Sequence, residues 1–199
     1  MENPRARLAV LLSGSGRTLT NFLEHIEAGT LPVDIVGVVS SRGDVRGVDL
    51  AREAGIPVAV FRRKDYPDVA AHNAALFAWL APLKPQIVAL AGYLCFVERP
   101  GWFTGPLVNI HPALLPKHGG QGMYGDRVHR AVLAAGEEES GCTVHHVDDE
   151  YDHGQIIAQG KVPVLPSDDE HDLAARVFAR ECELYPRVLA DLARDLLTG

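Results

Sequence analysis

Short apolar runs alternate with amphipathic segments along the first half of the chain. Four runs have the length and composition of buried strands, and they lie at residues 7–12, 34–40, 57–61 and 87–91. Three amphipathic segments predict helices, at residues 19–27, 48–54 and 65–83. This alternation is typical of an α/β protein in which right-handed crossovers join parallel strands. We therefore predict a predominantly parallel sheet with helices on both faces.

The pattern changes in the second half. A glycine-rich segment at 118–125 precedes a predicted helix at 126–135, and two strands follow at 141–147 and 155–164. Because their connection is short, we expect these two strands to be antiparallel. Ser167 is the expected N-cap of a closing helix that runs from about residue 168 to 197. With no internal repeat, linker or low-complexity segment, the pattern predicts one domain over residues 1–199.

Composition narrows the classes of function. The chain has 199 residues, 47% hydrophobic and 23% charged, and a formal net charge of -7. That charge, without a run of Lys or Arg, argues against binding to nucleic acid or to a membrane surface. The apolar run at 8–12 is too short for a signal sequence or a membrane span. Three widely spaced cysteines suit a reducing cytoplasm, where we expect the protein to act as a monomer or homodimer.

A glycine loop follows the first predicted strand. Its sequence is Ser13-Gly14-Ser15-Gly16-Arg17-Thr18, and a helix is expected directly after it. A strand, a glycine loop and a helix N-terminus can present backbone N–H groups to an anion. The third glycine of a dinucleotide fingerprint is missing, so the loop predicts a single phosphate site. A plain tight turn is the alternative.

A second candidate is Asn109-Ile110-His111, which ends an apolar run and precedes Pro112 and Pro116. In a strand, residues i and i+2 point to the same face, so Asn109 and His111 are expected to point together. An amide donor beside an imidazole suits a developing oxyanion and a proton in transit. A strand end with two satisfied polar side chains is the alternative.

Three loops follow apolar runs and are expected at one edge of the sheet, where α/β proteins bind their ligands. They are the glycine loop, the loop after Gly92 and the segment at Asn109–His111. The apolar stretch 93–97 within the second loop could contact a flat aromatic ligand, or it could be a buried connector.

Histidines and acidic residues gather in the second half. Six of the nine histidines lie between His111 and His153, but no Cys/His spacing is typical of zinc, and we expect no metal. The acidic run at 148–152 is either a solvated turn or the source of a carboxylate that returns to pair with an imidazole. Asp152, which precedes His153-Gly154, is the best candidate for that carboxylate.

Together these motifs resemble the phosphoribosylglycinamide formyltransferase family over almost the whole chain. The matching stretches are Ser13–Gly16, Leu90–Tyr93, Asn109–Pro116, Gly141–His145 and Asp152–Gly154. The resemblance implies a Rossmann-like formyltransferase fold with an antiparallel C-terminal portion. It also implies transfer of a formyl group from 10-formyltetrahydrofolate to the amine of 5-phosphoribosylglycinamide in purine (IMP) biosynthesis.

The resemblance also implies roles for individual residues. Asn109 and protonated His111 would stabilise the oxyanion, and Asp152 would orient His111 and favour its charged form. The residues implied in ribonucleotide binding are Gly14, Ser15, Gly16, Arg17, Thr18 and Glu181. Those implied in folate binding are Leu94, Cys95, Phe96, Val97, Asn109, His146, Val147 and Asp148.

Three features depart from the family pattern. Cys95 stands where an arginine is common, and the loop at 118–125 differs from the shorter bacterial pattern. The segment after Lys64 has no clear match to the basic residue that often contacts the folate tail, for which Arg63 and Lys64 are the candidate substitutes. Two other functions remain open: formyl transfer to a different amine, and a catalytically silent nucleotide- or folate-binding module. Intact Asn109, His111 and Asp152 argue against the silent module.

Overall fold

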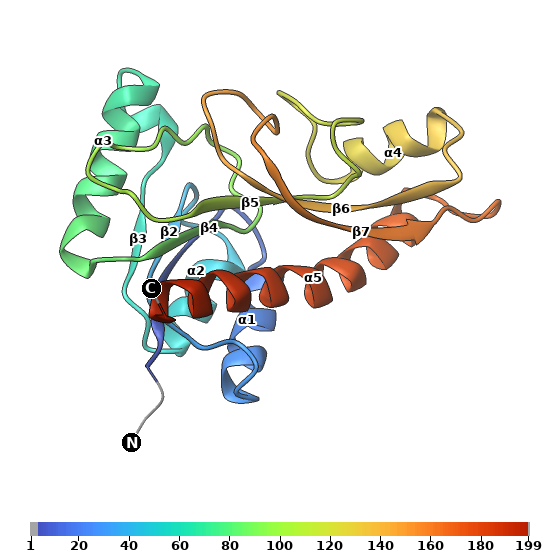
Figure 1. Ribbon diagram of the computed structural model, residues 1–199. Helices are drawn as coiled ribbons and strands as arrows, with labels where there is room; N and C mark the ends of the chain where they lie inside the picture. Colours follow the sequence, from blue (N-terminus) through green and yellow to red (C-terminus); the bar gives the residue numbers. More distant parts are fainter. Residues whose placement is uncertain (1–3, 199) are drawn as a thin grey trace. The chain divides into compact units, whose positions relative to one another are not determined.

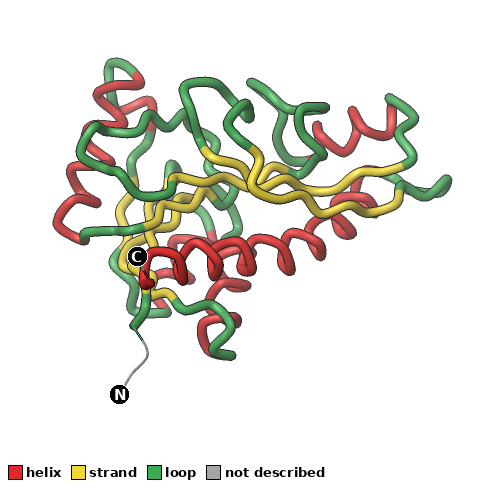
Figure 2. The backbone as a smooth tube through the Cα atoms, in the orientation of Figure 1, coloured by secondary structure: helices red, strands yellow, loops and turns green. Residues whose placement is uncertain are grey.

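The computed structural model describes residues 4–198 and has an α/β fold with one mixed β-sheet (Figure 1). Its seven strands follow the order β3-β2-β1-β4-β5-β6-β7. β1 is parallel to β2 and β4, and β2 is parallel to β3. β6 and β7 are antiparallel, and they run side by side in Figure 2. The predicted fold class, a mostly parallel sheet with an antiparallel C-terminal portion, is confirmed.

The strands are β1 (Ala6–Leu12), β2 (Val33–Ser40), β3 (Val58–Val60), β4 (Ile87–Leu90), β5 (Leu107–His111), β6 (Glu139–His146) and β7 (Ile156–Pro163). The α-helices are α1 (Arg17–Glu27), α2 (Arg46–Glu53), α3 (Val69–Leu80), α4 (Asp126–Ala134) and α5 (Glu170–Thr198). Two short 3-10 helices, η1 (Arg63–Asp65) and η2 (Ala81–Leu83), flank α3.

The chain divides into two compact units. One comprises Met1–Val108 and Leu189–Gly199, and the other comprises Asn109–Val188. The boundary falls within β5, just before Asn109. A single functional domain over residues 1–199 stays a prediction.

In the first unit, glycines allow helices and strands to approach one another closely. A Cβ added at Gly16, at the start of α1, would lie 2.6 Å from the Cα of Gly47 in α2. A Cβ added at Gly37 in β2 would lie 3.2 Å from the Trp79 ring of α3. α1 and α2 therefore share one layer, whereas α3 packs on the face of β2 that Gly37 presents. Strand β1 between these layers is almost completely buried.

In the second unit, a buried hydroxyl ties the segment after β5 to the β6–β7 pair. Thr143 Oγ1 donates to the Ala113 carbonyl at 2.7 Å and accepts the Leu115 N–H at 3.0 Å. Gln159 Nε2 donates to the same hydroxyl oxygen at 2.9 Å. The backbone that leaves β5 is thus fixed against two other strands, and this holds the C-terminal end of β5 in place.

Two details of the sequence prediction are wrong. The helix expected over 65–83 is divided into η1, α3 and η2, because Asp68 caps α3 by accepting the Ala71 N–H at 2.7 Å. The expected cap of α5, Ser167, does not fill that role. Asp169 Oδ1 accepts the N–H groups of His171 and Asp172 at 2.8 Å, as an N-cap does.

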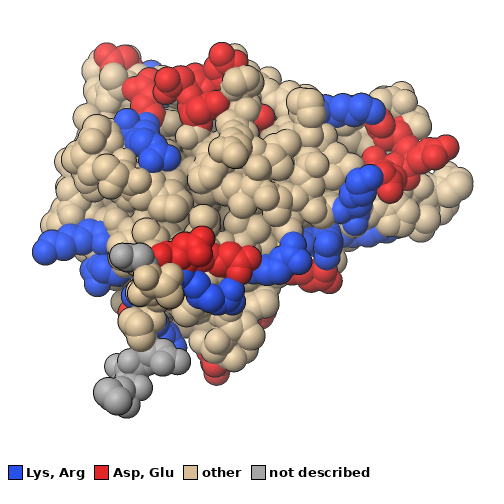
Figure 3. All heavy atoms as spheres, viewed as in Figure 1, with Lys and Arg blue, Asp and Glu red and all other residues tan. Residues whose placement is uncertain are grey.

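None of the helices within residues 4–198 combines the length and the apolar character needed to cross a bilayer. On the face shown in Figure 3, Lys and Arg side chains lie beside Asp and Glu in small mixed groups.

Candidate active site

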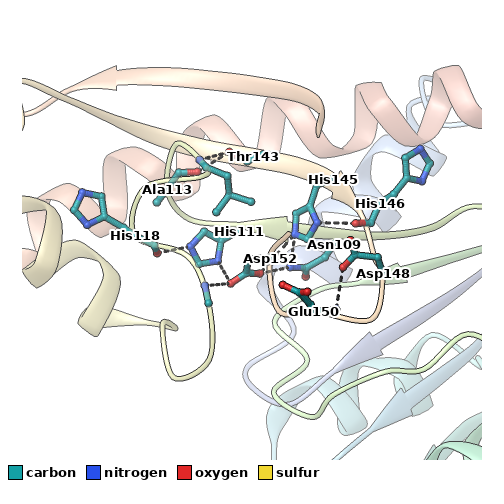
Figure 4. A network of polar contacts seen from close by, with 12 residues as sticks. Asn109, His111, Ala113, His118, Thr143, His145, His146, Asp148, Glu150 and Asp152 are labelled. Carbon is teal, nitrogen blue, oxygen red and sulfur yellow. Dashed lines mark hydrogen bonds and ion pairs between the residues drawn. The ribbon is translucent and has the colours of Figure 1, made fainter. Parts of the chain in front are cut away.

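Asn109 and His111, at the end of β5, face one carboxylate, that of Asp152 (Figure 4). His111 Nδ1 lies 3.3 Å from Asp152 Oδ2, and Asn109 Nδ2 donates to Asp152 Oδ1 at 3.4 Å. The side chain of His111 is only 4% exposed and that of Asp152 11%. The structure therefore brings together the three residues that the sequence marked as catalytic candidates.

The backbone turn that delivers Asp152 depends on two positions. Asp152 itself has a φ of 55°, in the left-handed region that Asp tolerates better than most residues. Gly154 approaches β6 so closely that an added Cβ would overlap the His146 carbonyl oxygen. The sequence predicted that Gly154 permits the turn, and the structure adds that the positive φ falls on Asp152.

His145, on β6, completes the polar cluster. Its Nδ1 donates to the His146 carbonyl at 2.8 Å, so in the neutral ring Nε2 is an acceptor. Asn109 Nδ2 lies 3.1 Å from this Nε2 and donates to it. Both N–H bonds of the Asn109 amide therefore face acceptors, one on His145 and one on Asp152.

The loop after β5 supplies two backbone contacts to the same pair. His111 Nε2 donates to the His118 carbonyl at 2.8 Å, and the Gly120 N–H donates to Asp152 Oδ2 at 3.0 Å. Since a carbonyl oxygen only accepts, Nε2 of His111 must carry a proton. Its Nδ1 then faces the Asp152 carboxylate, and a second proton would turn this contact into an ion pair.

Burial dominates the protonation of His111. It lowers the pKa of His111 below its usual value, although the Asp152 charge and the His118 carbonyl both act to raise it. Burial acts to raise the pKa of Asp152, but its contact with the His145 ring, the charge that His111 carries when protonated and the Gly120 N–H together lower it. The charged form of His111, implied by the family resemblance, is thus not the favoured resting state at neutral pH.

This arrangement suits the chemistry of acyl-type transfer. An amide with two N–H donors lies beside a buried imidazole that can gain a proton, and a carboxylate stabilises the resulting charge.

Sequence and structure comparisons identify the family. The family model described as formyl transferase matches residues 6–189. The chain belongs to the formyl transferase family. It is 41% identical over 194 residues to a chloroplastic phosphoribosylglycinamide formyltransferase from Vigna unguiculata, covering 96% of this chain and 62% of that protein. It is 40% identical to the trifunctional purine biosynthetic protein adenosine-3 of Drosophila pseudoobscura pseudoobscura, covering 99% of this chain but only 14% of that protein.

Solved structures agree with this assignment. The glycinamide ribonucleotide transformylase 1 of Symbiobacterium toebii has a TM-score of 0.89 and is 36% identical, over 98% of this chain and 90% of that one. The fold of this formyl transferase chain is therefore that of glycinamide ribonucleotide transformylases.

The predicted phosphate loop lies between β1 and α1 in the first unit. Gly16 is the N-cap residue of α1, with a φ of 78°. A Cβ added at Gly14 would meet nothing within 4 Å. Ser15 and Arg17 are exposed, whereas Thr18 is partly buried. The loop thus places a glycine-flanked backbone directly before a helix N-terminus, as the sequence predicted.

The predicted folate loop, Leu94–Val97, lies after β4 in the first unit and is held by polar side chains. The Leu94 N–H donates to Ser13 Oγ at 2.9 Å, and Asn73 Nδ2 donates to the Phe96 carbonyl at 3.2 Å. Leu94 is 47% exposed, Cys95 and Phe96 are intermediate, and Val97 is buried. The loop is therefore neither a wholly buried connector nor a free surface loop.

The remaining predicted binding residues lie in the second unit. His146, Val147 and Asp148 follow the buried His145 and are all partly exposed. Asp148 Oδ2 lies 2.9 Å from His153 Nδ1, and Asp148 Oδ1 accepts the Glu150 N–H at 3.0 Å. Glu181 is on α5, close enough to Cys142 of β6 to raise the pKa of its thiol, a rise due mainly to burial.

Sequence reasoning missed His145, His118 and Gly120 as parts of the cluster. Strand periodicity could have placed His145 on the same face of β6 as Thr143, two residues before it. No side-chain pattern could have found His118 and Gly120, since they act through the backbone. Among residues 4–198, no group of three or more His, Cys, Asp or Glu side chains is arranged to hold a metal ion.

Proposed function

We propose that this protein is a phosphoribosylglycinamide formyltransferase, which transfers the formyl group of 10-formyltetrahydrofolate to the amine of 5-phosphoribosylglycinamide in purine biosynthesis. The observation that carries the proposal is the buried cluster of Asn109, His111 and Asp152 in a chain of the formyl transferase family. The proposed enzyme is one cytoplasmic domain, needs no metal, and acts as a monomer or homodimer.

In this reaction the amine attacks the formyl carbon, the formyl oxygen becomes negative, and the folate nitrogen then leaves. Asn109 would donate an N–H to that oxygen. Its contact with Asp152 Oδ1, at 3.4 Å, is longer than its 3.1 Å contact with His145, so it is the one more easily exchanged. His145 keeps the amide oriented, because its Nε2 accepts the other N–H.

His111 would accept a proton from the attacking amine and later donate it to the leaving nitrogen. Because burial lowers its pKa, His111 begins mainly neutral at neutral pH and can take up at Nδ1 a proton released by the attacking amine. Asp152 Oδ2 stabilises the resulting imidazolium, whose charge in turn stabilises the nearby oxyanion. The same proton is then available to the leaving nitrogen.

The substrates are assigned to separate loops. Gly14, Ser15, Gly16, Arg17 and Thr18 would bind the ribonucleotide phosphate, which the N-terminus of α1 supports through its free N–H groups and its dipole. Glu181 would contact the same ligand. Half-exposed Leu94 and partly exposed Phe96 fit an apolar contact with the flat pterin ring, together with the backbone of the neighbouring folate-loop residues.

An acceptor comparison tests the proposal. Purified protein with 10-formyltetrahydrofolate is assayed against 5-phosphoribosylglycinamide and against an amino-sugar nucleotide. We expect turnover with the first acceptor only. Preference for the second would replace the acceptor but keep the chemistry. Tight binding of both ligands without turnover by any acceptor would instead indicate a silent binding module.

A further inference from the structure

The loop between β5 and α4 clamps the catalytic pair with its backbone. The His118 carbonyl accepts from His111 Nε2, and two residues later the Gly120 N–H donates to Asp152 Oδ2. Between them, a Cβ added at Gly119 would lie 2.5 Å from Leu115 Cδ2 and 3.2 Å from Asp152 Cβ. This close packing makes the geometry of the pair sensitive to small shifts of the loop.

The conformation of His118 is unusual for its residue type. Its φ is 56°, in the left-handed region, which is unfavourable for a non-glycine residue. Such a conformation persists when its surroundings fix it. The side chain of His118 supplies a second point of attachment, since it is only 16% exposed and points to a partner outside the loop.

That partner is Glu137, in the connection between α4 and β6. His118 Nε2 donates to Glu137 Oε1 at 3.3 Å, and Lys117 Nζ lies 3.0 Å from both carboxylate oxygens of Glu137. The hydrogen bonds from Lys117, and then from His118, lower the pKa of Glu137, so it is an anion at neutral pH. Two consecutive residues of the loop are thereby fixed to one carboxylate.

We propose that Glu137 is a positioning residue. It holds His118 in place, so that the His118 carbonyl and the Gly120 N–H keep the side chains of His111 and Asp152 facing each other. Glu137 touches neither catalytic side chain, and it acts through the loop. This inference rests on the proposed function of the cluster. It gives a role to the first three residues of the segment 118–125, for which the predicted phosphate and folate sites provide none.

Several groups face His111 and must be considered with it. They are the Asp152 carboxylate, the imidazoles of His118 and His145, and His129 from α4. Besides burial, which lowers the pKa of His111, the imidazoles of His145 and His118 lower it, whereas the Asp152 charge and the His118 carbonyl raise it. Release of the His118 carbonyl therefore lowers the pKa of His111, and an NMR titration of the ring measures this directly.

The test uses three variants and one matched control. E137A removes the anchor, H118N removes the imidazole but keeps a residue that tolerates positive φ, and K117M removes the other partner of Glu137. The control is E139Q, which breaks a neighbouring surface ion pair with Lys161 at 2.7 Å. Circular dichroism and thermal unfolding verify that every variant folds.

For E137A and H118N we expect kcat to fall by up to about 100-fold with both KM values unchanged, as for a misplaced catalytic group. The pKa of His111 falls in E137A, whereas in H118N the loss of the His118 imidazole opposes that fall, so H118N is judged by kcat. The double variant is scarcely worse in kcat than either single one. K117M and E139Q keep both kcat and the His111 titration.

An E137A protein with normal turnover and a normal His111 titration overturns the inference. So does a loss confined to thermal stability. If the wild-type protein transfers no formyl group, the proposed function fails, but the titration still decides whether Glu137 positions His111.

Discussion

At the scale of single residues, one carboxylate contacts four polar groups. Asp152 Oδ2 faces His111 Nδ1 and accepts the Gly120 N–H, while Oδ1 accepts from Asn109 and lies 3.6 Å from His145 Nε2. Because its φ is 55°, asparagine is the replacement that best preserves the backbone. Asp152→Asn therefore isolates the effect of the charge.

We expect Asp152→Asn to reduce kcat by about 10²–10³ while both KM values stay close to normal, since an electrostatic stabiliser of the reaction is lost. Without the negative charge, the pKa of His111 falls further below its usual value, because the Asp152 charge is the larger of the two influences that oppose burial. The acid limb of the pH profile that reports His111 therefore moves to lower pH. Steady-state kinetics from pH 5 to 9 and an NMR titration measure both effects.

Asp149→Asn is the matched control, because Asp149 is an exposed neighbour in the same acidic run. It should change neither kcat nor the titration. His111→Ala should be at least as damaging as Asp152→Asn, and combining them should add little. If the two losses multiply in the double variant, Asp152 and His111 do not act as a unit.

The sequence could reveal Asn109 and His111 because strand periodicity puts residues i and i+2 on one face. Asp152 could be predicted as the acidic residue two positions before Gly154 in a short connection. The contacts of the His118 carbonyl and the Gly120 N–H were not accessible, because backbone groups leave no signature in residue type. The lowered pKa of His111 could not be predicted from the sequence either, because it depends on burial, which outweighs the neighbouring charge in the folded protein.

At the scale of elements, the two glycines of the loop before α1 have different tasks. Gly16 needs its positive φ of 78° and has the Cα of Gly47 2.6 Å from an added Cβ, whereas Gly14 has free space. A substitution at Gly16 therefore disturbs the packing of α1 on α2 before any ligand is considered. Gly14 is the position at which ligand binding alone can be tested.

We expect Gly14→Ala to fold normally and to raise the KM for the ribonucleotide, because its new methyl group occupies space beside the phosphate. The KM for the folate should not change. Gly16→Ala should instead lower stability by roughly 1–2 kcal/mol from its backbone conformation alone, and by more where it meets α2. Thermal unfolding and the two KM values measure these effects. Equal weakening of both substrates by Gly14→Ala would contradict a phosphate site.

The loop after β4 allows a similar separation. Leu94 is 47% exposed, so Leu94→Asp should leave the fold intact, whereas Phe96 is only partly exposed and its replacement would also affect packing. If the pterin ring packs on Leu94, the variant should bind folate at least about tenfold more weakly, given the usual value of a buried leucine contact. Calorimetry with each ligand is the measurement. Unchanged folate affinity would remove Leu94 from the binding site.

The helices and strands themselves were largely predictable because their apolar periodicity is clear. The errors fall where one polar side chain ends or starts a helix. Asp68 begins α3 inside a segment that reads as one long helix, and Asp169 displaces Ser167 as the cap of α5. Both Asp and Ser cap helices well, so composition could not choose between neighbouring candidates.

At the scale of the whole molecule, the sequence predicted the class of the sheet but not the complete strand order. The order β3-β2-β1-β4 follows from the reversal of crossover direction after β3, which no local pattern determines. The division into two compact units within β5 was likewise not visible, because Leu107–His111 is one uninterrupted strand. Both properties arise from long-range packing.

Stability is also a property of the whole molecule, and its dependence on pH follows from the buried groups. Burial lowers the pKa of His111 and of His129 below the usual 6.5, so the unfolded chain binds these protons first and stability falls as pH drops below about 6.5. Asp168 is hydrogen-bonded to Arg176 and to the Leu165 N–H, and its pKa is about 2 instead of 3.8. A second loss of stability therefore occurs as pH falls from about 4 towards 2.

Exposed His153 has a raised pKa and acts in the opposite direction, but solvent screens its contribution. We thus expect the melting temperature to decrease in two steps between pH 7 and pH 2.

Two variants assign the steps. His129→Gln should weaken the first step, because one buried imidazole no longer has to remain neutral, while the second step stays. Asp168→Asn should lower the melting temperature at pH 7 and flatten the curve between pH 4 and pH 2, since the carboxylate that loses its ion pair is gone. Asp191→Asn, which breaks an exposed pair with Arg194 on the same helix, is the control and should change neither step. Thermal unfolding by circular dichroism at half-unit pH intervals gives the curves.

If Asp168→Asn left the curve below pH 4 as steep as in the unmodified protein, the acid sensitivity would have to come from other carboxylates. Asp152 would be the first to test, because its pKa is also lowered.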